Sequence, residues 1–178
     1  MPVPPQTDRR IGRQRLPRSA AGVMSLVELL VVVAIISLLM ATATPVYVKI
    51  QRRAQATALA NDFRVFAAAL QSHGHEAGSW PAEAPPGTVP PGVTALEIRA
   101  KDWDRVTVIG GRFDWERSQM HNGIRYAAAL ALVDTAAAPL LHDLDMFRML
   151  DEALDDGNLA TGNFILGEND CPLLILEK

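Results

Sequence analysis

The stretch GVMSLVELLVVVAIISLLMATATPVYV, residues 22–48, determines how the rest of the chain is interpreted. Twenty consecutive residues within it, Leu29–Val48, carry no charge and are mostly Leu, Val, Ile and Ala. A helix of about 20 residues is about 30 Å long, which matches the hydrocarbon thickness of a bilayer. Five arginines and one aspartate precede this run. Such a basic flank predicts that residues 1–22 stay in the cytoplasm and that the chain after Val48 lies across the membrane.

One charge, Glu28, lies at the start of the apolar run, and three interpretations of the segment treat it differently. A secretory signal peptide would be cut near Ala41-Thr42-Ala43, but this run is long for a signal peptide. A carboxylate inside it is also unfavourable in lipid. An uncleaved single-pass anchor explains the length and leaves Glu28 without a purpose. In the third interpretation Glu28 belongs to a motif.

The segment from Gly22 to Pro45 resembles the N-terminus of type IV pilins and type II secretion pseudopilins. In that family a basic leader ending in Gly is removed by a prepilin peptidase, and the new N-terminal residue is methylated. The fifth residue of the mature chain is glutamate and the twenty-second is proline. Glu28 and Pro45 occupy these two positions if Met24 is the first mature residue.

The position of the cut remains open between two peptide bonds. The family places Gly directly before the cut, whereas here Val23 separates Gly22 from Met24. Cleavage therefore follows Gly22, with the glutamate one position late, or it follows Val23, which then replaces the glycine.

The resemblance gives Glu28 a role in assembly. In a mature chain that begins at Met24, the new amine lies one helical turn from Glu28. In a filament the carboxylate can instead meet the amine of a neighbouring subunit. Either pairing offsets the cost of a charge in lipid, so we expect Glu28 to set the axial register between subunits. The alternative is a carboxylate that stays hydrated among lipid headgroups.

The helical pattern continues beyond the apolar run. Residues 49–72 contain neither Gly nor Pro, and an apolar stripe recurs at helical spacing. This stripe is predicted to be core: Leu59, Phe63, Phe66 and Leu70. Pro45 removes one backbone hydrogen bond, which predicts a kink near the membrane exit.

The predicted head contains a small sheet and a second helix. Gly110-Gly111 between Val106–Ile109 and Arg112–Trp115 predicts a β-hairpin. Asn122-Gly123 predicts a turn before a strand over Ile124–Val133, whose alanine-rich face would permit close approach of the long helix. The remaining predicted elements are a helix within 141–156, with Leu144, Phe147, Leu150 and Leu154 on one face, and a last hairpin over 163–166 and 172–177.

The expected fold is α+β and type IV pilin-like, with a long N-terminal transmembrane helix packed on a small antiparallel sheet and one extra helix. The predicted parts are a leader over 1–23, a membrane half of the helix over 24–48, an amphipathic half over 49–76 and a periplasmic globular head over 77–178.

Charge and composition argue against several classes of function. Residues 1–22 carry a charge of +4, which leaves −7 for the rest of a chain whose total is −3. An acidic head is unsuited to nucleic acid, which is therefore not expected as a partner. The single cysteine, Cys171, excludes an intramolecular disulfide. No pattern of nucleophile and base is evident, and neither His121 nor His142 is expected to meet an acid, so an enzyme is not predicted.

No cofactor is predicted, and one weak candidate for a metal site remains. Asp155 and Asp156 follow the second predicted helix, and some major pseudopilins hold calcium in their heads. The ligand spacing of an EF-hand is absent, so solvated charges are the preferred interpretation and a calcium ion is the alternative.

The resemblance implies a structural subunit of a type II secretion pseudopilus or a type IV pilus-like filament. Its partners would be the inner membrane, a prepilin peptidase and other subunits, either copies of itself or sister proteins. It would start as a single-pass inner-membrane protein with a cytoplasmic N-terminus and a periplasmic head. The alternative is a membrane-tethered periplasmic binding module that does not polymerise, and a third possibility is an exported hydrolase released after Ala43.

Overall fold

The structure, a computed structural model, describes residues 25–178 of the 178-residue chain. The predicted cleavage positions Gly22, Val23 and Met24 lie outside the described residues. The chain forms two compact units that divide between Ala43 and Thr44. The helix that carries the apolar run continues from the first unit into the second.

Helix α1 extends over Leu26–Ala77, which confirms the predicted long N-terminal helix. It continues through Pro45 as one helix, and the predicted kink stays a prediction. Burial begins only in its second half. The buried residues include all four predicted core positions: Ala56, Leu59, Ala60, Phe63, Phe66, Ala67 and Leu70.

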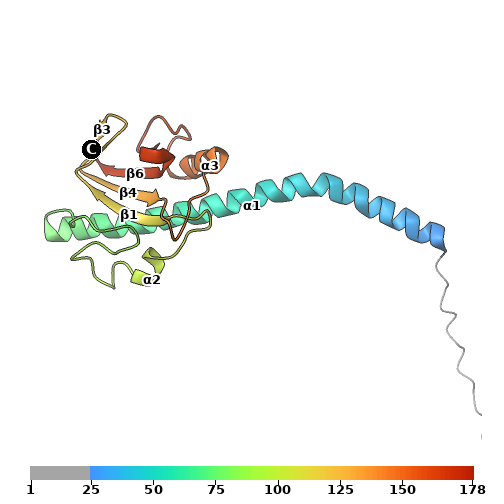
Figure 1. The fold of residues 1–178 in the computed structure, drawn as a ribbon, viewed down its shortest axis with the longest axis horizontal. Helices are drawn as coiled ribbons and strands as arrows, with labels where there is room; N and C mark the ends of the chain where they lie inside the picture. The colour runs from blue at the N-terminus through green and yellow to red at the C-terminus, as the bar shows by residue number, and fades with distance from the viewer. Residues whose placement is uncertain (1–24) are drawn as a thin grey trace, which may run out of the picture. The chain divides into compact units, whose positions relative to one another are not determined.

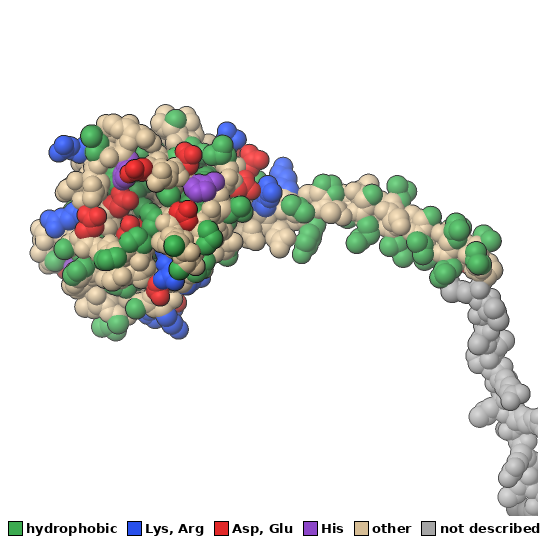
Figure 2. Space-filling view, in the orientation of Figure 1, with side chains coloured by type: hydrophobic (Ala, Val, Ile, Leu, Met, Phe, Trp, Pro, Cys, Tyr) green, Lys and Arg blue, Asp and Glu red, His purple; other side chains and the backbone are tan. Residues whose placement is uncertain are grey.

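The N-terminal part of α1 exposes apolar side chains to its surroundings (Figure 2). Every large hydrophobic side chain from Leu26 to Met40 is at least 43 % exposed in the isolated chain. By length and composition this part of α1 can cross a membrane. The described chain therefore contains an apolar helical segment that its own head does not cover.

The head contains a four-stranded antiparallel sheet in the order β1-β4-β6-β5 (Figure 1). Its strands are β1 (Arg112–Arg117), β4 (Ala128–Val133), β5 (Phe164–Leu166) and β6 (Pro172–Glu177). Strands β5 and β6 form the predicted last hairpin, and the turn between them contains a short 3-10 helix over Glu168–Asp170. The fold is thus α+β, with a long helix followed by a small antiparallel sheet.

The strand predicted over Ile124–Val133 is divided into two parts. The Asn122-Gly123 turn joins β2 (Met120–His121) to β3 (Ile124–Arg125) in a separate two-stranded sheet. The chain then leaves that sheet at Tyr126, whose N–H donates to the Gln119 carbonyl over 3.1 Å, and β4 begins at Ala128. A register shift against β6 follows between Ala128 and Ala129.

The hairpin predicted at Gly110-Gly111 is wrong. Val106–Ile109 is not a strand, and its backbone instead meets residues 138–141, with the Leu141 N–H donating to the Ile109 carbonyl over 2.8 Å. A Cβ atom at Gly110 would lie 1.9 Å from the Pro139 carbonyl oxygen. The glycines are therefore needed where two backbone segments pass closely, and that requirement produces the same sequence signal as a tight turn.

An aromatic cluster joins α1 to one face of the sheet. The Phe63 ring centroid lies 5.2 Å from that of Phe113 and 5.9 Å from that of Phe164, both edge to face. Phe66 lies 4.8 Å from Phe113 and 5.1 Å from Trp103 in the same arrangement. Rings at these separations contribute packing beyond the area they bury. The head is thus held to the second half of α1 by interlocking rings.

The face of the sheet that meets α1 is the bulky one. Leu130 and Leu132 belong to the core cluster that contains the α1 stripe, whereas Ala129 and Ala131 belong to a second buried cluster with Ile165. The alanine-rich face predicted for this strand is confirmed over β4, but the long helix does not approach it. The alanines lie on the face away from the α1 stripe, because the bulky residues of that stripe fill the space on the other face.

Two short helices complete the head. Helix α2 (Ala100–Trp103) places Trp103 in the core. Helix α3 (Leu144–Leu154) begins at Asp143, whose side chain accepts hydrogen bonds from the Asp145 and Met146 N–H groups. It buries Phe147 and Leu150 as predicted, but Leu144 is 50 % exposed and is not part of the core.

Candidate functional site

The predicted assembly residue Glu28 lies in the first turn of α1 and caps it. The Ser25 N–H donates to Glu28 Oε2 over 2.9 Å, and the Glu28 N–H donates to Ser25 Oγ over 3.2 Å. This reciprocal pair is a capping box, a motif that the S-x-x-E sequence Ser25–Glu28 announces and that sequence reasoning overlooked. Glu28 therefore has a local partner before any contact with an amine or a neighbouring subunit.

A negative first turn also suits the helix electrostatically. The unpaired N–H groups at a helix N-terminus carry a partial positive charge that favours a carboxylate. Glu28 is solvent-exposed in the isolated chain, so its carboxylate remains accessible to a further partner. Glu28 can thus cap the helix and also form an ion pair with a cationic group.

The weak candidates Asp155 and Asp156 are joined by a residue that the sequence did not single out. One carboxylate oxygen from each of Asp151, Asp155 and Asp156 lies within 4.8 Å of the others. Asp151 is wholly buried, and neither of its carboxylate oxygens accepts a hydrogen bond of ordinary geometry from residues 25–178. Burial raises the pKa of Asp151, opposed by the backbone N–H groups of Gly157 and Asp156 and reinforced by the charges of Asp156 and Asp155.

Asp155 and Asp156 also organise the loop that follows α3. Asp155 Oδ2 accepts from the N–H groups of Asn163 and Phe164. Asp156 accepts from the Asn158 N–H over 2.8 Å and from Thr161 Oγ1 over 2.7 Å. These hydrogen bonds keep the pKa of Asp156 below its usual value. Both acids therefore stabilise the loop through hydrogen bonds that do not involve a metal.

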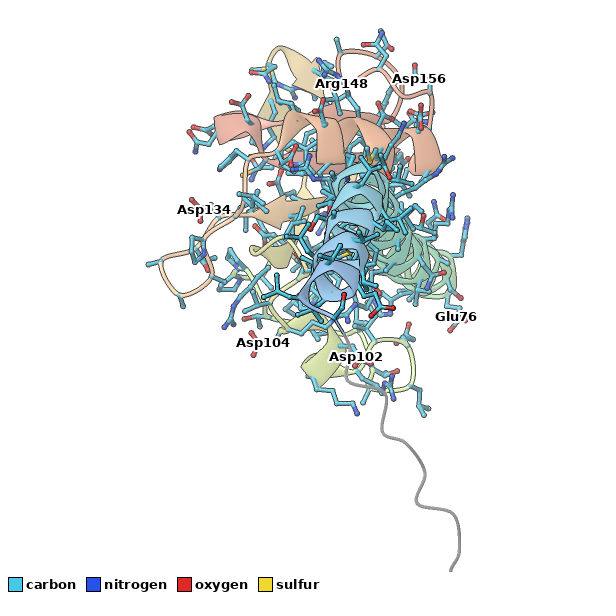
Figure 3. All side chains as sticks on the ribbon, turned by 90° about the vertical axis from the view of Figure 1, so that its right-hand side faces the viewer. Glu76, Asp102, Asp104, Asp134, Arg148 and Asp156 are labelled. Atoms are coloured by element: carbon cyan, nitrogen blue, oxygen red, sulfur yellow. The ribbon has the colours of Figure 1, made fainter. Side chains whose placement is uncertain are left out.

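The three carboxylates admit two chemical states. A hard cation such as calcium takes several oxygen ligands, and three converging carboxylates fit that preference. A proton on Asp151 satisfies the same cluster, because it removes one of three adjacent negative charges and supplies a donor. Asp156 lies on the α3 side of the head, away from Asp102 and Asp104 near α2 (Figure 3).

A histidine does meet an acid, contrary to the sequence-based expectation. His121 Nε2 lies 2.8 Å from Glu116 Oε2, and the Tyr126 hydroxyl donates to the same oxygen. The His121 and Tyr126 rings stack with centroids 5.7 Å apart. Burial, and then the bond to Glu116, raise the pKa of Tyr126. The spacing of these residues gave no signal, because β1, β2 and the end of β3 come together only through the fold.

The surroundings of that pair favour a structural role. Cys171 borders the same cavity of about 180 Å³, and burial raises the pKa of its thiol. A thiol held in its neutral form is a weak nucleophile. The Glu116–His121–Tyr126 contacts connect β1 to the β2-β3 hairpin, and their evident effect is to hold that hairpin against the outer face of the sheet.

Asp114 is the most strongly perturbed acid of β1. It lies on the same strand as Glu116, two residues earlier, and its Oδ1 is buried without a hydrogen-bond partner in the described part of the chain. Burial, together with the charges of Glu116 and Glu83, raises its pKa to about 7 against a weaker opposing hydrogen bond from the Trp115 N–H.

Comparisons with protein-family models, with curated proteins and with solved structures find no match for the chain.

Proposed function

We propose that this protein is a pilin-type structural subunit, processed at its N-terminus and assembled through α1 into a type II secretion pseudopilus or a type IV pilus-like filament. In this proposal the leader is removed by a prepilin peptidase and the remaining chain enters the inner membrane with its head in the periplasm. Its partners are copies of itself or sister subunits, and the protein has no catalytic activity of its own.

The observation that carries the proposal is the contrast between the two parts of α1. From Ala56 onward, one face of the helix is buried by the head, whereas every large apolar side chain from Leu26 to Met40 is exposed. Exposed apolar surface on this scale is unfavourable in water and requires either lipid or other protein to cover it. A helix that lies in lipid before assembly and packs against neighbouring helices in a filament has its apolar side chains covered in both places.

Glu28 distinguishes an assembling helix from a plain anchor. A hydrophobic anchor gains only a helix cap from an acid in its first turn, whereas a filament subunit also gains a charge that fixes the axial position of its neighbour. The hydrogen bonds between Ser25 and Glu28 hold that carboxylate at the end of the helix, where an incoming amine can reach it. The long helix followed by a small antiparallel sheet is compatible with a pilin-like shape.

The intact mass of the protein recovered from its native cells and from their medium tests the proposal. We expect a chain that begins at Val23 or Met24 and carries one added methyl group. A chain that begins at Thr44 would indicate a secreted protein, and an unprocessed N-terminus would indicate the membrane-tethered binding module. Either of these two results would refute pilin-type processing.

A further inference from the structure

A groove between α1 and α3 lies directly after the apolar run in the chain. It has a volume of about 670 Å³ and lies within the second compact unit. The α1 wall comes from residues Pro45 to Thr57 and the α3 wall from residues Asp145 to Ala153. Among the lining residues are Val48, Lys49, Arg53, Arg148 and Met149.

The groove carries uncompensated positive charge. Four of its lining residues are basic and two are acidic. Arg52 lies 3.5 Å from Asp143, and Arg148 lies 3.2 Å from Asp145. Lys49 and Arg53 are exposed, and neither side chain has an ion pair or a hydrogen bond with any residue between 25 and 178. An anion that entered the groove would therefore find two free cationic groups against one lining acid, Glu152, that has no ion pair among residues 25–178.

The polarity of the groove changes along α1 in a defined direction. Pro45 and Val48 contribute apolar surface at the end nearer the apolar run, and Met149 adds to it from α3. Lys49 is the first charged residue after that run, and Arg53 follows one turn later. At about 1.5 Å per residue, Val48 to Arg53 spans about 8 Å, close to the depth of one headgroup layer.

We propose that this groove binds the phosphate of an anionic phospholipid, with Lys49 and Arg53 as the groups that recognise it. The inference rests on the membrane span of the proposed function, because that span places Lys49 at the level of the headgroups. Val48 and Met149 pack against the glycerol and the first methylenes of the lipid. Basic residues next to a membrane span attract anionic lipid in this way, each by a modest amount.

The full chain in a mild detergent provides the test, with dioleoylphosphatidylglycerol and dioleoylphosphatidylcholine as the two added lipids. Native mass spectrometry counts the lipids retained by the protein. We expect the wild type to retain the anionic lipid in preference, and Lys49→Gln with Arg53→Gln to lose about fivefold in preference for each residue. Both side chains are exposed, so the substitutions leave the core intact.

A matched pair of substitutions controls for total charge. Lys101→Gln with Arg125→Gln removes the same charge from two other exposed positions, one of them on α2. Figure 3 shows Arg148, which lines the groove, on the α3 side of the head, and Asp102 of α2 on the opposite side. The control variant should keep the wild-type lipid preference. An equal loss in both variants would show a general charge effect and overturn the site.

Other occupants give different results. Displacement of the lipid by excess inorganic phosphate at equal affinity would show that the groove reads phosphate alone, and would overturn the assignment to a lipid. Loss of self-association in Lys49→Gln with Arg53→Gln, without any lipid preference in the wild type, would assign the groove to a second copy. Lipid retention in detergent does not require processing or assembly. A processed, assembling chain without lipid preference would therefore refute this site alone, and an unprocessed chain with that preference would refute the proposed function alone.

Discussion

Ser25 and Glu28 exchange two hydrogen bonds across the first turn of α1, each backbone N–H donating to the other's side chain. Two roles for Glu28 are therefore separable. Ser25→Ala removes one half of the capping box, which costs about 1 kcal/mol of local helix stability, and leaves the carboxylate in place. Glu28→Ala removes the carboxylate as well.

If Glu28 sets the register between subunits, Glu28→Ala should impair incorporation into filaments while Ser25→Ala incorporates normally. The fraction of protein in sheared filaments measures incorporation, and resistance to alkaline extraction shows that both variants still enter the membrane. Equal defects in the two variants would indicate that capping alone matters. Normal incorporation of Glu28→Ala would count against the register role.

Phe63 connects α1 to two strands, because its ring meets both Phe113 of β1 and Phe164 of β5. Phe63→Ala should lower the free energy of unfolding of the head by about 3–5 kcal/mol. Val65, two residues later on α1, is 53 % exposed, and Val65→Ala should change it little. Urea unfolding followed by near-ultraviolet circular dichroism measures both. Comparable losses would show that the aromatic contacts do not hold the head to α1.

Asp114 predicts a stability that decreases as the pH rises. Its side chain keeps a proton to about pH 7 in the folded head and loses it near pH 3.8 when unfolded. Between these values the folded state binds more protons, so the free energy of unfolding should decrease from pH 4 to pH 7, by at most about 4 kcal/mol. Asp114→Asn should remove that part of the slope in urea unfolding. An unchanged slope would show that Asp114 is ionised in the folded head.

Substitution of Asp151 distinguishes a bound proton from a bound cation in the cluster of Asp151, Asp155 and Asp156. If Asp151 is protonated in the folded head, Asp151→Asn should raise the free energy of unfolding at pH 7 by about 1 kcal/mol, because Asn is uncharged in both states whereas Asp151 must take up a proton on folding. The gain should vanish at pH 4, and thermal unfolding with calcium or with a chelator should give the same midpoint. A calcium-dependent rise that Asp151→Asn abolishes would instead establish a cation site.

Alanine substitutions at Gly110 and Gly123 distinguish the cost of steric crowding from the cost of backbone strain. Both have φ near +81°, but a Cβ would lie 1.9 Å from the Pro139 oxygen at Gly110 and within 4 Å of nothing at Gly123. Gly123→Ala should cost about 1–2 kcal/mol from backbone conformation alone. Gly110→Ala should cost clearly more in the same thermal unfolding measurement. Equal costs would show that the segment over Pro139 can move aside.

The sequence predicted α1 well because both of its signals are local. An uncharged run and an apolar stripe at helical spacing survive in any tertiary context, so Leu59, Phe63, Phe66 and Leu70 were assigned to the core correctly. The Gly110-Gly111 signal failed because glycine serves tight turns and close backbone contacts alike. Nothing near Gly110 in sequence reveals that residues 138–141 pass beside it.

The candidate sites were harder to predict from the sequence than the fold. Asp155 and Asp156 were visible as adjacent acids, and Asp151 lies one helical turn before Asp155, but its convergence with Asp156 depends on how the chain turns after α3. Glu116 and His121 are five residues apart across a turn, and their contact depends on how the β2-β3 hairpin folds back. The capping box was different, since Ser25 and Glu28 stand at the required spacing and the signal was simply not used.

The distribution of tryptophan has a practical consequence for optical experiments. All three tryptophans, Trp80, Trp103 and Trp115, lie in the head, and Trp103 and Trp115 are fully buried. Tryptophan fluorescence will therefore follow unfolding of the head and will not report transfer of the apolar half of α1 between lipid and protein. A fluorescent dye attached before Pro45 would report that transfer, so that unfolding of the head and transfer of the helix can be timed independently in one sample.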